Sequence, residues 1–127
     1  VTQVQGGAAG TFDQLFRVGP GDVVIASCFP RYSELALKTV QYAKDRGATI
    51  IGVTASEMSP VYQMSSGSLL VRNEMISFVD SLAAPMSMLN ALILAAAHKQ
   101  GTDISATFNE LEHVWDRFGI FGKVEDE

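Results

Sequence analysis

Three short apolar runs, separated by segments with the length and pattern of helices, constrain the fold of this chain most strongly. The runs cover residues 23–26, 49–54 and 69–71. Nearly continuous apolar sequence is typical of strands that are buried on both faces of a parallel sheet. Parallel strands cannot be joined by a tight turn and need a longer crossover, which is usually a helix. The pattern therefore predicts βαβ units and an α/β fold in which helices cover a parallel sheet.

The segments around these runs carry helix signals. Ser33 can cap a helix that ends at Gly47, and Ser59 followed by Pro60 has the form of an N-cap and a first helical residue. Residues 1–5 alternate between apolar and polar, which predicts a further short strand. Other helices are expected over residues 8–18, with Thr11 as a possible cap, over 85–99 and over 104–117.

Length and composition fit one packed domain. The chain has 127 residues, of which 47% are hydrophobic and 18% charged, as in globular proteins with a real core. The formal net charge is −5, from nine basic and fourteen acidic residues. This argues against this segment binding nucleic acid itself, because phosphate binding needs clustered Lys and Arg. The single cysteine excludes an intrachain disulfide and fits a reducing cytosol, so we expect a cytoplasmic location.

The most apolar stretch covers residues 82–97. Its sixteen residues include a proline, a serine and an asparagine, whereas a membrane-spanning helix needs about twenty apolar residues. The stretch therefore predicts a buried helix, and no membrane partner is expected. A helix that is apolar nearly all round lies in a large core or at an interface. In a domain of this size we favour a dimer interface shared with the last helix, through Phe108, Leu111 and Trp115.

Two hydroxyl-rich loops follow the first two apolar runs. In an open parallel sheet, ligands bind beyond the carboxyl ends of the strands, where loops lead into helices. Exposed amides at such positions favour an anion, and an arginine can bind a phosphate or carboxylate with two hydrogen bonds. The candidate ligand-binding residues are Ser27, Cys28, Arg31 and Ser33 in the first loop, and Thr54, Ser56 and Ser59 in the second.

Each candidate also has a purely structural interpretation. Ser33 and Ser59 can be ordinary helix caps, Thr54 and Ser56 can satisfy the loop backbone, and Arg31 can be a solvated surface residue. Cys28 follows a strand and precedes a helix, so it could be a nucleophile, but a small buried thiol is the more common case.

Catalytic and metal-binding signals are weaker. Glu74 could transfer protons as a base or be a solvated loop carboxylate. The glycine-rich segment after residues 1–5 does not match GxGxxG. His98 and His113 lack a second ligand at helical spacing, so neither a cofactor nor a metal is expected.

The stretch GDVVIASCFPRYSELALKTVQYAKDRGATIIGVTASEMSPVYQMSSGSLLV resembles the sugar isomerase (SIS) domain. More narrowly, the FPRYS loop and the later DSLAAPMSMLNAL segment resemble the C-terminal effector domain of RpiR-type transcriptional regulators. The similarity runs from about residue 19 to residue 97. It implies a three-layer αβα fold with a flavodoxin-like parallel sheet, in a single SIS domain over residues 1–127.

The resemblance also implies a function and roles for several residues. In such regulators a separate helix-turn-helix domain binds DNA, while the SIS domain senses a phosphosugar or sugar acid and forms a homodimer or tetramer. By position, Cys28 stands where the family usually has a ligand-binding serine, and Ser33 where a hydroxyl closes the loop on phosphate. Phe29 and Pro30 replace a polar residue and a glycine, which removes a backbone N–H.

Residues 1–5 match the second strand of the family fold, so we expect the first strand and helix to be missing. Three alternatives follow: the domain is truncated, a partner chain fills the gap, or the sheet is rearranged with its order preserved. The leading hypothesis is a metabolite-sensing, dimerising domain of a transcriptional regulator without catalytic activity. The alternatives are a sugar-phosphate isomerase with Glu74 as base, and a dimerisation module with a vestigial pocket.

Overall fold

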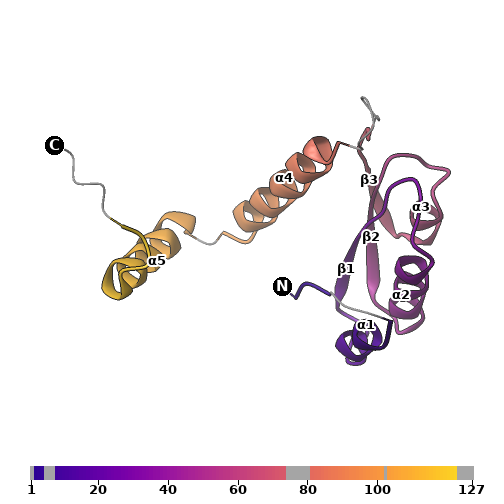
Figure 1. Cartoon of the computed structure of the whole chain (residues 1–127), viewed down its shortest axis with the longest axis horizontal. Coiled ribbons are helices and arrows are strands. Elements are labelled where there is room, and N and C mark those ends of the chain that lie inside the picture. The colour runs from indigo at the N-terminus through magenta and orange to yellow at the C-terminus, as the bar shows by residue number, and fades with distance from the viewer. Residues whose placement is uncertain (1, 5–7, 74–80, 102, 123–127) are drawn as a thin grey trace. The chain divides into compact units, whose positions relative to one another are not determined.

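The computed structural model describes residues 2–4, 8–73, 81–101 and 103–122. In the described part of the chain, helices and strands alternate from α1 to α4, and a last helix, α5, follows (Figure 1). It divides into two compact units, Val1–Met88 and Leu89–Glu127. The elements are α1 Ala8–Leu15, β1 Val23–Ser27, α2 Glu34–Asp45, β2 Thr49–Thr54, α3 Pro60–Met64, β3 Gly67–Leu70, α4 Ala83–Lys99 and α5 Ile104–Phe118.

The three strands form a parallel sheet in the order β1-β2-β3. Val23 pairs with Thr49 at the start of β1, and Thr54 pairs with Leu70 at the end of β3. At the start of the pairing between β1 and β2, the amide of Thr49 also donates to the carbonyl of Asp22 at 2.9 Å. The predicted α/β fold with parallel βαβ units is confirmed.

The first crossover helix, α2, begins and ends where its sequence signals lie. Ser33 is its N-cap, and its hydroxyl accepts a hydrogen bond from the amide of Ala36. At the other end Gly47 has φ +90°, and its amide donates to the carbonyl of Lys44. The amide of Ala48 reaches back to the carbonyl of Ala43. These two bonds form a Schellman motif, which turns the chain directly into β2.

The core of the first unit lies between the sheet and the helices α2 and α3. The order of the strands across the sheet is the same as their order along the chain. Right-handed crossovers between such strands place both crossover helices on the same face of the sheet. Figure 1 shows α2 and α3 on that one face. The buried cluster comprises Ala26, Cys28, Val40, Ala43, Ala48, Ile50 and Val61.

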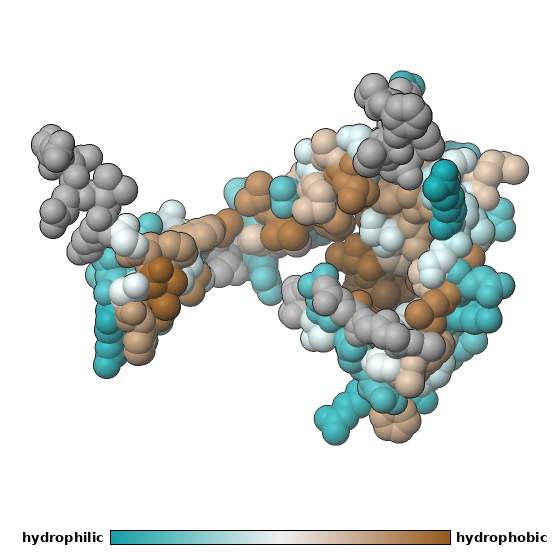
Figure 2. All heavy atoms as spheres, in the orientation of Figure 1, coloured by the Kyte–Doolittle hydropathy of each residue, from teal (hydrophilic) through white to brown (hydrophobic). Residues whose placement is uncertain are grey.

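The opposite face of β1 is open in this chain. Val23 and Ile25 are 61% and 51% exposed, while Ala26 between the sheet and the helices is buried. The expectation that this strand is buried on both faces is therefore wrong for β1. Apolar side chains gather on the visible side of the sheet and along α4 in Figure 2.

Within the second unit, α5 has a capping signal at each end. The carboxylate of Asp103 accepts from the amide of Ala106, and Gly119 follows the helix in the left-handed conformation with φ 63°. Trp115 and Phe121 pack edge to face at 5.2 Å between ring centroids. An open apolar groove of about 230 Å³ is lined by Ala97, Gln100, Ile104, Thr107, Phe108 and Leu111.

Three other expectations need correction. Residues 2–4 are exposed and form no strand, because an alternating pattern is stable as a strand only when a neighbour pairs with it; Val1 and Gln5 lie outside the described residues. The first helix starts at Ala8, so Thr11 lies inside it and is not its cap. Of the two placements expected for the apolar helix α4, a core of this chain is wrong, since only Pro85 in it is buried, and the favoured dimer interface stays a prediction. No described helix is long and apolar enough to cross a membrane.

Candidate ligand-binding site

The polar loops after the strands come together because the strands are parallel and in register. The amide of Cys28, just beyond β1, donates to the carbonyl of Val53 at 3.0 Å. The amide of Val71, just beyond β3, donates to the carbonyl of Thr54 at 2.9 Å. The pairing thus continues past the ends of β1 and β3, and the residues that follow all three strands lie along one edge of the sheet.

Two hydroxyl groups at this edge are buried without a hydrogen-bond partner. Thr54 ends β2 and is fully buried, and Ser59 is 1% exposed. In the described part of the chain, neither the Thr54 Oγ1 nor the Ser59 Oγ has a partner. Ser59 precedes α3 as its N-cap, but its side chain makes no capping bond. A buried hydroxyl without a partner costs about 1–3 kcal/mol, so these two groups call for an explanation.

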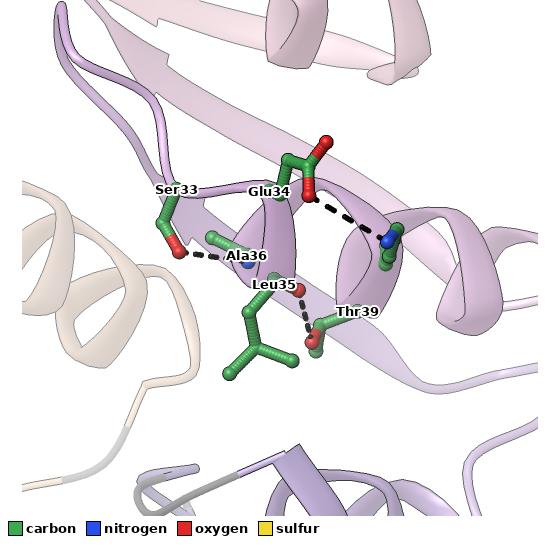
Figure 3. Close-up of polar contacts among 6 residues, drawn as sticks. Ser33, Glu34, Leu35, Ala36 and Thr39 are labelled. Atoms are coloured by element: carbon green, nitrogen blue, oxygen red, sulfur yellow. Dashed lines mark hydrogen bonds and ion pairs between the residues drawn. The ribbon is translucent and has the colours of Figure 1, made fainter.

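The hydroxyls of Ser33 and Ser56 already have backbone partners. Ser33 accepts from the amide of Ala36 at 3.4 Å, as Figure 3 shows at the start of α2. Ser56 accepts from the amide of Met58 at 3.1 Å and so closes its own loop. Their structural roles are those that the sequence allowed. A hydroxyl that accepts a bond still has its own hydrogen to donate, so both remain candidates for ligand binding.

Arg31 has an unusual backbone conformation. Its φ is +70°, and it is the only non-glycine residue in the described ranges with a positive φ. The side chain is exposed and forms no ion pair within the described residues. A side chain in the left-handed region is uncommon and concentrates at ligand clamps and switches. Arg31 therefore places a cationic side chain on the loop that leads from β1 to α2, at a strained backbone position.

Cys28 belongs to the apolar core. Its side chain is part of the cluster under α2 and α3, and burial raises its pKa above the ordinary value of 9.0. The thiol therefore stays protonated near neutral pH and is a poor nucleophile. Ser27, the residue before it, is exposed and on the opposite face of β1, because side chains alternate along a strand. Ligand binding by either side chain stays a prediction.

One further polar group at the same edge was not anticipated. Asn73 lies just beyond the end of β3, as Thr54 lies at the end of β2. The Oδ1 of Asn73 is buried without a partner in the described region. The sequence carries a signal for it, namely a polar residue shortly after a third apolar strand. Glu74, the candidate base, lies outside the described residues.

The arrangement offers hydrogen-bond donors for an anion. Hydroxyls and a guanidinium suit phosphate or carboxylate oxygens. Among the described residues, no group of three His, Cys, Asp or Glu side chains could hold a metal ion.

The family model of the SIS domain matches residues 1–95. The chain therefore belongs to the SIS domain family, whose fold is the three-layer αβα arrangement with a parallel sheet.

Among solved structures, the chain is similar to the sugar isomerase domain of an RpiR transcription factor from Sphaerobacter thermophilus. The TM-score is 0.73 at 18% identity, and the match covers 89% of this chain and 62% of that one. A second solved structure, of a hypothetical protein, has a TM-score of 0.55 at 20% identity, covering 67% of this chain and 52% of that one. The chain thus spans about three fifths of the length of the RpiR domain. No curated protein matches the chain.

Proposed function

We propose that this chain is the metabolite-sensing domain of a transcriptional regulator, and that it binds a sugar phosphate or sugar acid where the strands end. The observation that carries the proposal is the pair of buried hydroxyls, Thr54 and Ser59, which lack a partner in the described chain. A ligand oxygen that accepts from both would remove the cost of burying them.

Arg31 supplies the charge for this site. It lies on the loop between β1 and α2, at a left-handed backbone position, and β1 is the sheet neighbour of β2, the strand that ends at Thr54. A guanidinium gives two parallel hydrogen bonds to a phosphate or carboxylate. The similarity to an RpiR transcription factor domain supports regulation over catalysis. The two histidines of the chain lie on α4 and α5, so none is available on the loops after β1 and β2.

Assembly belongs to the same proposal. We place a homodimer or tetramer contact on α4 and α5, whose apolar side chains are exposed in the single chain. Ile93 and Leu94 of α4 are 64% and 63% exposed, and Phe108 and Phe118 of α5 are 56% and 68% exposed. Large exposed apolar patches mark interaction surfaces. DNA binding would reside in a separate domain, and the location would be cytoplasmic.

Calorimetric titration of the natural protein with glucose 6-phosphate, gluconate and related sugar phosphates and acids tests the ligand site. We expect one class to bind, and Arg31→Ala to weaken it by about tenfold or more, the usual effect of a lost charged hydrogen bond. Arg17→Ala, an exposed arginine before β1, is the matched control and should bind normally. Absence of binding by every compound would refute the site.

The isomerase alternative has its own readout. An isomerase would interconvert an aldose phosphate and its ketose phosphate, and this turnover would fall sharply in Glu74→Gln. We expect no turnover in the natural protein.

A further inference from the structure

The carboxamide of Asn73 is a third unpartnered group at the edge of the sheet where Thr54 lies. Its Oδ1 is buried and has no hydrogen-bond partner in the described residues, as is also true of the Thr54 and Ser59 hydroxyls. These three oxygens are the only buried side-chain polar atoms without a partner in the described ranges. Thr54 ends β2, Ser59 lies in the loop after it, and Asn73 follows β3, the neighbouring strand of the sheet.

The backbone fixes how near Asn73 lies to the proposed site. Val71 is tied to Thr54 by the 2.9 Å bond between its amide and the Thr54 carbonyl. Asn73 follows two residues later, so its Cα is within about 7 Å of the Cα of Val71. Neighbouring strands lie about 4.8 Å apart. A ligand the size of a hexose at the Thr54 end of β2 is therefore within reach of the Asn73 side chain.

The chemistry of Asn73 differs from that of the other groups. Thr54, Ser59 and Arg31 can each donate a hydrogen bond, which suits the oxygens of a phosphate or carboxylate. The Oδ1 of an asparagine only accepts, and an ionised phosphate or carboxylate has little or nothing to donate to it. The unpartnered Oδ1 therefore calls for a donor on the ligand, and on a sugar phosphate or sugar acid that donor is a hydroxyl group.

We propose that Asn73 is a specificity-determining residue of the ligand site, and that its Oδ1 accepts a hydrogen bond from a hydroxyl of the ligand. This inference rests on the proposed ligand-binding function. It divides the site into an anion-binding part, formed by Arg31, Thr54 and Ser59, and a hydroxyl-binding part formed by Asn73. The ligand is then a polyhydroxylated anion, and an anion without hydroxyls binds more weakly.

The test compares two probes in calorimetry on the natural protein: glucose 6-phosphate or gluconate, whichever binds more tightly, and inorganic phosphate. The measured quantity is the ratio of their affinities. We expect Asn73→Ala to lower this ratio about tenfold, the usual effect of one hydrogen bond, with phosphate affinity unchanged. Asn109→Ala, an exposed asparagine on α5, should leave the ratio as it is.

Two further variants separate this role from a structural one. Asn73→Asp keeps an acceptor but adds negative charge, so both affinities should fall while the ratio persists. Arg31→Ala should weaken both probes and also keep the ratio. If the probes bind and Asn73→Ala leaves the ratio unchanged in a folded protein, the role of Asn73 is refuted while the proposed function stands. If no probe binds to the unaltered protein, the proposed function and this inference both fail.

Discussion

The hydroxyl of Ser65 lies only 2.5 Å from the position that a Cβ on Gly52 would occupy. Ser65 follows α3, and its own hydroxyl donates to the carbonyl of Val61 at 2.6 Å. Gly52 is in the middle of β2, and the Val61 side chain is also within 3.2 Å of the same position. The missing side chain at Gly52 is therefore what lets α3 pack against β2, which in turn sets the loop that carries Ser59.

Gly52→Ala should destabilise the fold by about 1–3 kcal/mol, because the added methyl group overpacks this contact. Chemical denaturation would measure the change. Gly10→Ala is the control: Gly10 lies in α1 with nothing within 4 Å of its Cβ position, so this change should be neutral or slightly stabilising. Adding Ser65→Ala to Gly52→Ala should recover part of the loss, and no recovery would contradict the assigned contact.

Thr54→Val should make the protein more stable and a weaker binder. Valine has the shape of threonine without the hydroxyl, so the buried and unpartnered Oγ1 disappears, which stabilises by about 1 kcal/mol. Thr39→Val is the control, because the Thr39 hydroxyl donates to the carbonyl of Leu35 at 2.7 Å and its loss should not stabilise. Thermal unfolding with and without the best-binding sugar compound gives both quantities. A lower melting temperature for Thr54→Val would contradict the prediction.

Arg46, at the end of α2, should stabilise the packing of the segment that follows α1. Its guanidinium donates to the carbonyl of Phe16 at 3.1 Å and to that of Val18 at 3.3 Å. Lysine cannot present the same planar pair of donors. We expect Arg46→Lys to cost about 1 kcal/mol, given that the bonds are exposed. Hydrogen exchange should become faster in α1 and stay unchanged in β2; equal effects on both elements would argue against a local link.

The buried thiol of Cys28 predicts a loss of stability in alkaline solution. Burial raises its pKa in the folded state above the ordinary value of 9.0, so the folded state holds the proton more tightly than the unfolded state. The stability that the protonated thiol contributes to the folded state is therefore fully present below pH 9. It is lost as the pH rises from there through the folded-state pKa. Denaturant unfolding at several pH values should show a steeper alkaline loss for the unaltered chain than for Cys28→Ala. Equal slopes would mean that the thiol does not titrate in the core.

A charged residue in place of Phe108 on α5 should disrupt the proposed assembly. Phe108 is 56% exposed in the single chain and lines the groove with Leu111. Burying Phe108→Glu at a subunit contact would leave an uncompensated charge there. Sedimentation velocity should show a shift toward monomer for this variant. Glu112→Lys, an exposed position on α5, is the control. An unchanged oligomer in Phe108→Glu would place the contact elsewhere.

Much of the fold could be predicted because its signals are local. The apolar strand β2, the cap at Ser33 and the glycine at 47 each act on their immediate neighbours, and the structure has all three. Residues 2–4 failed as a strand because pairing depends on a neighbour that the local pattern does not specify. The same is true of α4, whose composition predicts burial but does not say against what.

The site was only partly predictable for similar reasons. Hydroxyls after two strands pointed to Thr54 and Ser59, and the structure places both at the expected edge. Sequence alone could not tell that Ser59 leaves its capping bond unmade while Ser33 makes one, since both stand before a helix. Nor could it single out Asn73, whose proposed role rests on the burial of one oxygen atom.

The backbone of Arg31 sets stability against the ligand binding that we propose for this residue. A position with φ +70° suits glycine, because any other side chain there carries a conformational cost of about 1–2 kcal/mol. Random mutagenesis followed by selection for heat resistance alone should therefore enrich glycine at this position. The same selection would remove the cation from the loop, so variants improved in this way should bind the proposed ligand more weakly. Selection for heat resistance would have to be combined with selection for binding of that ligand.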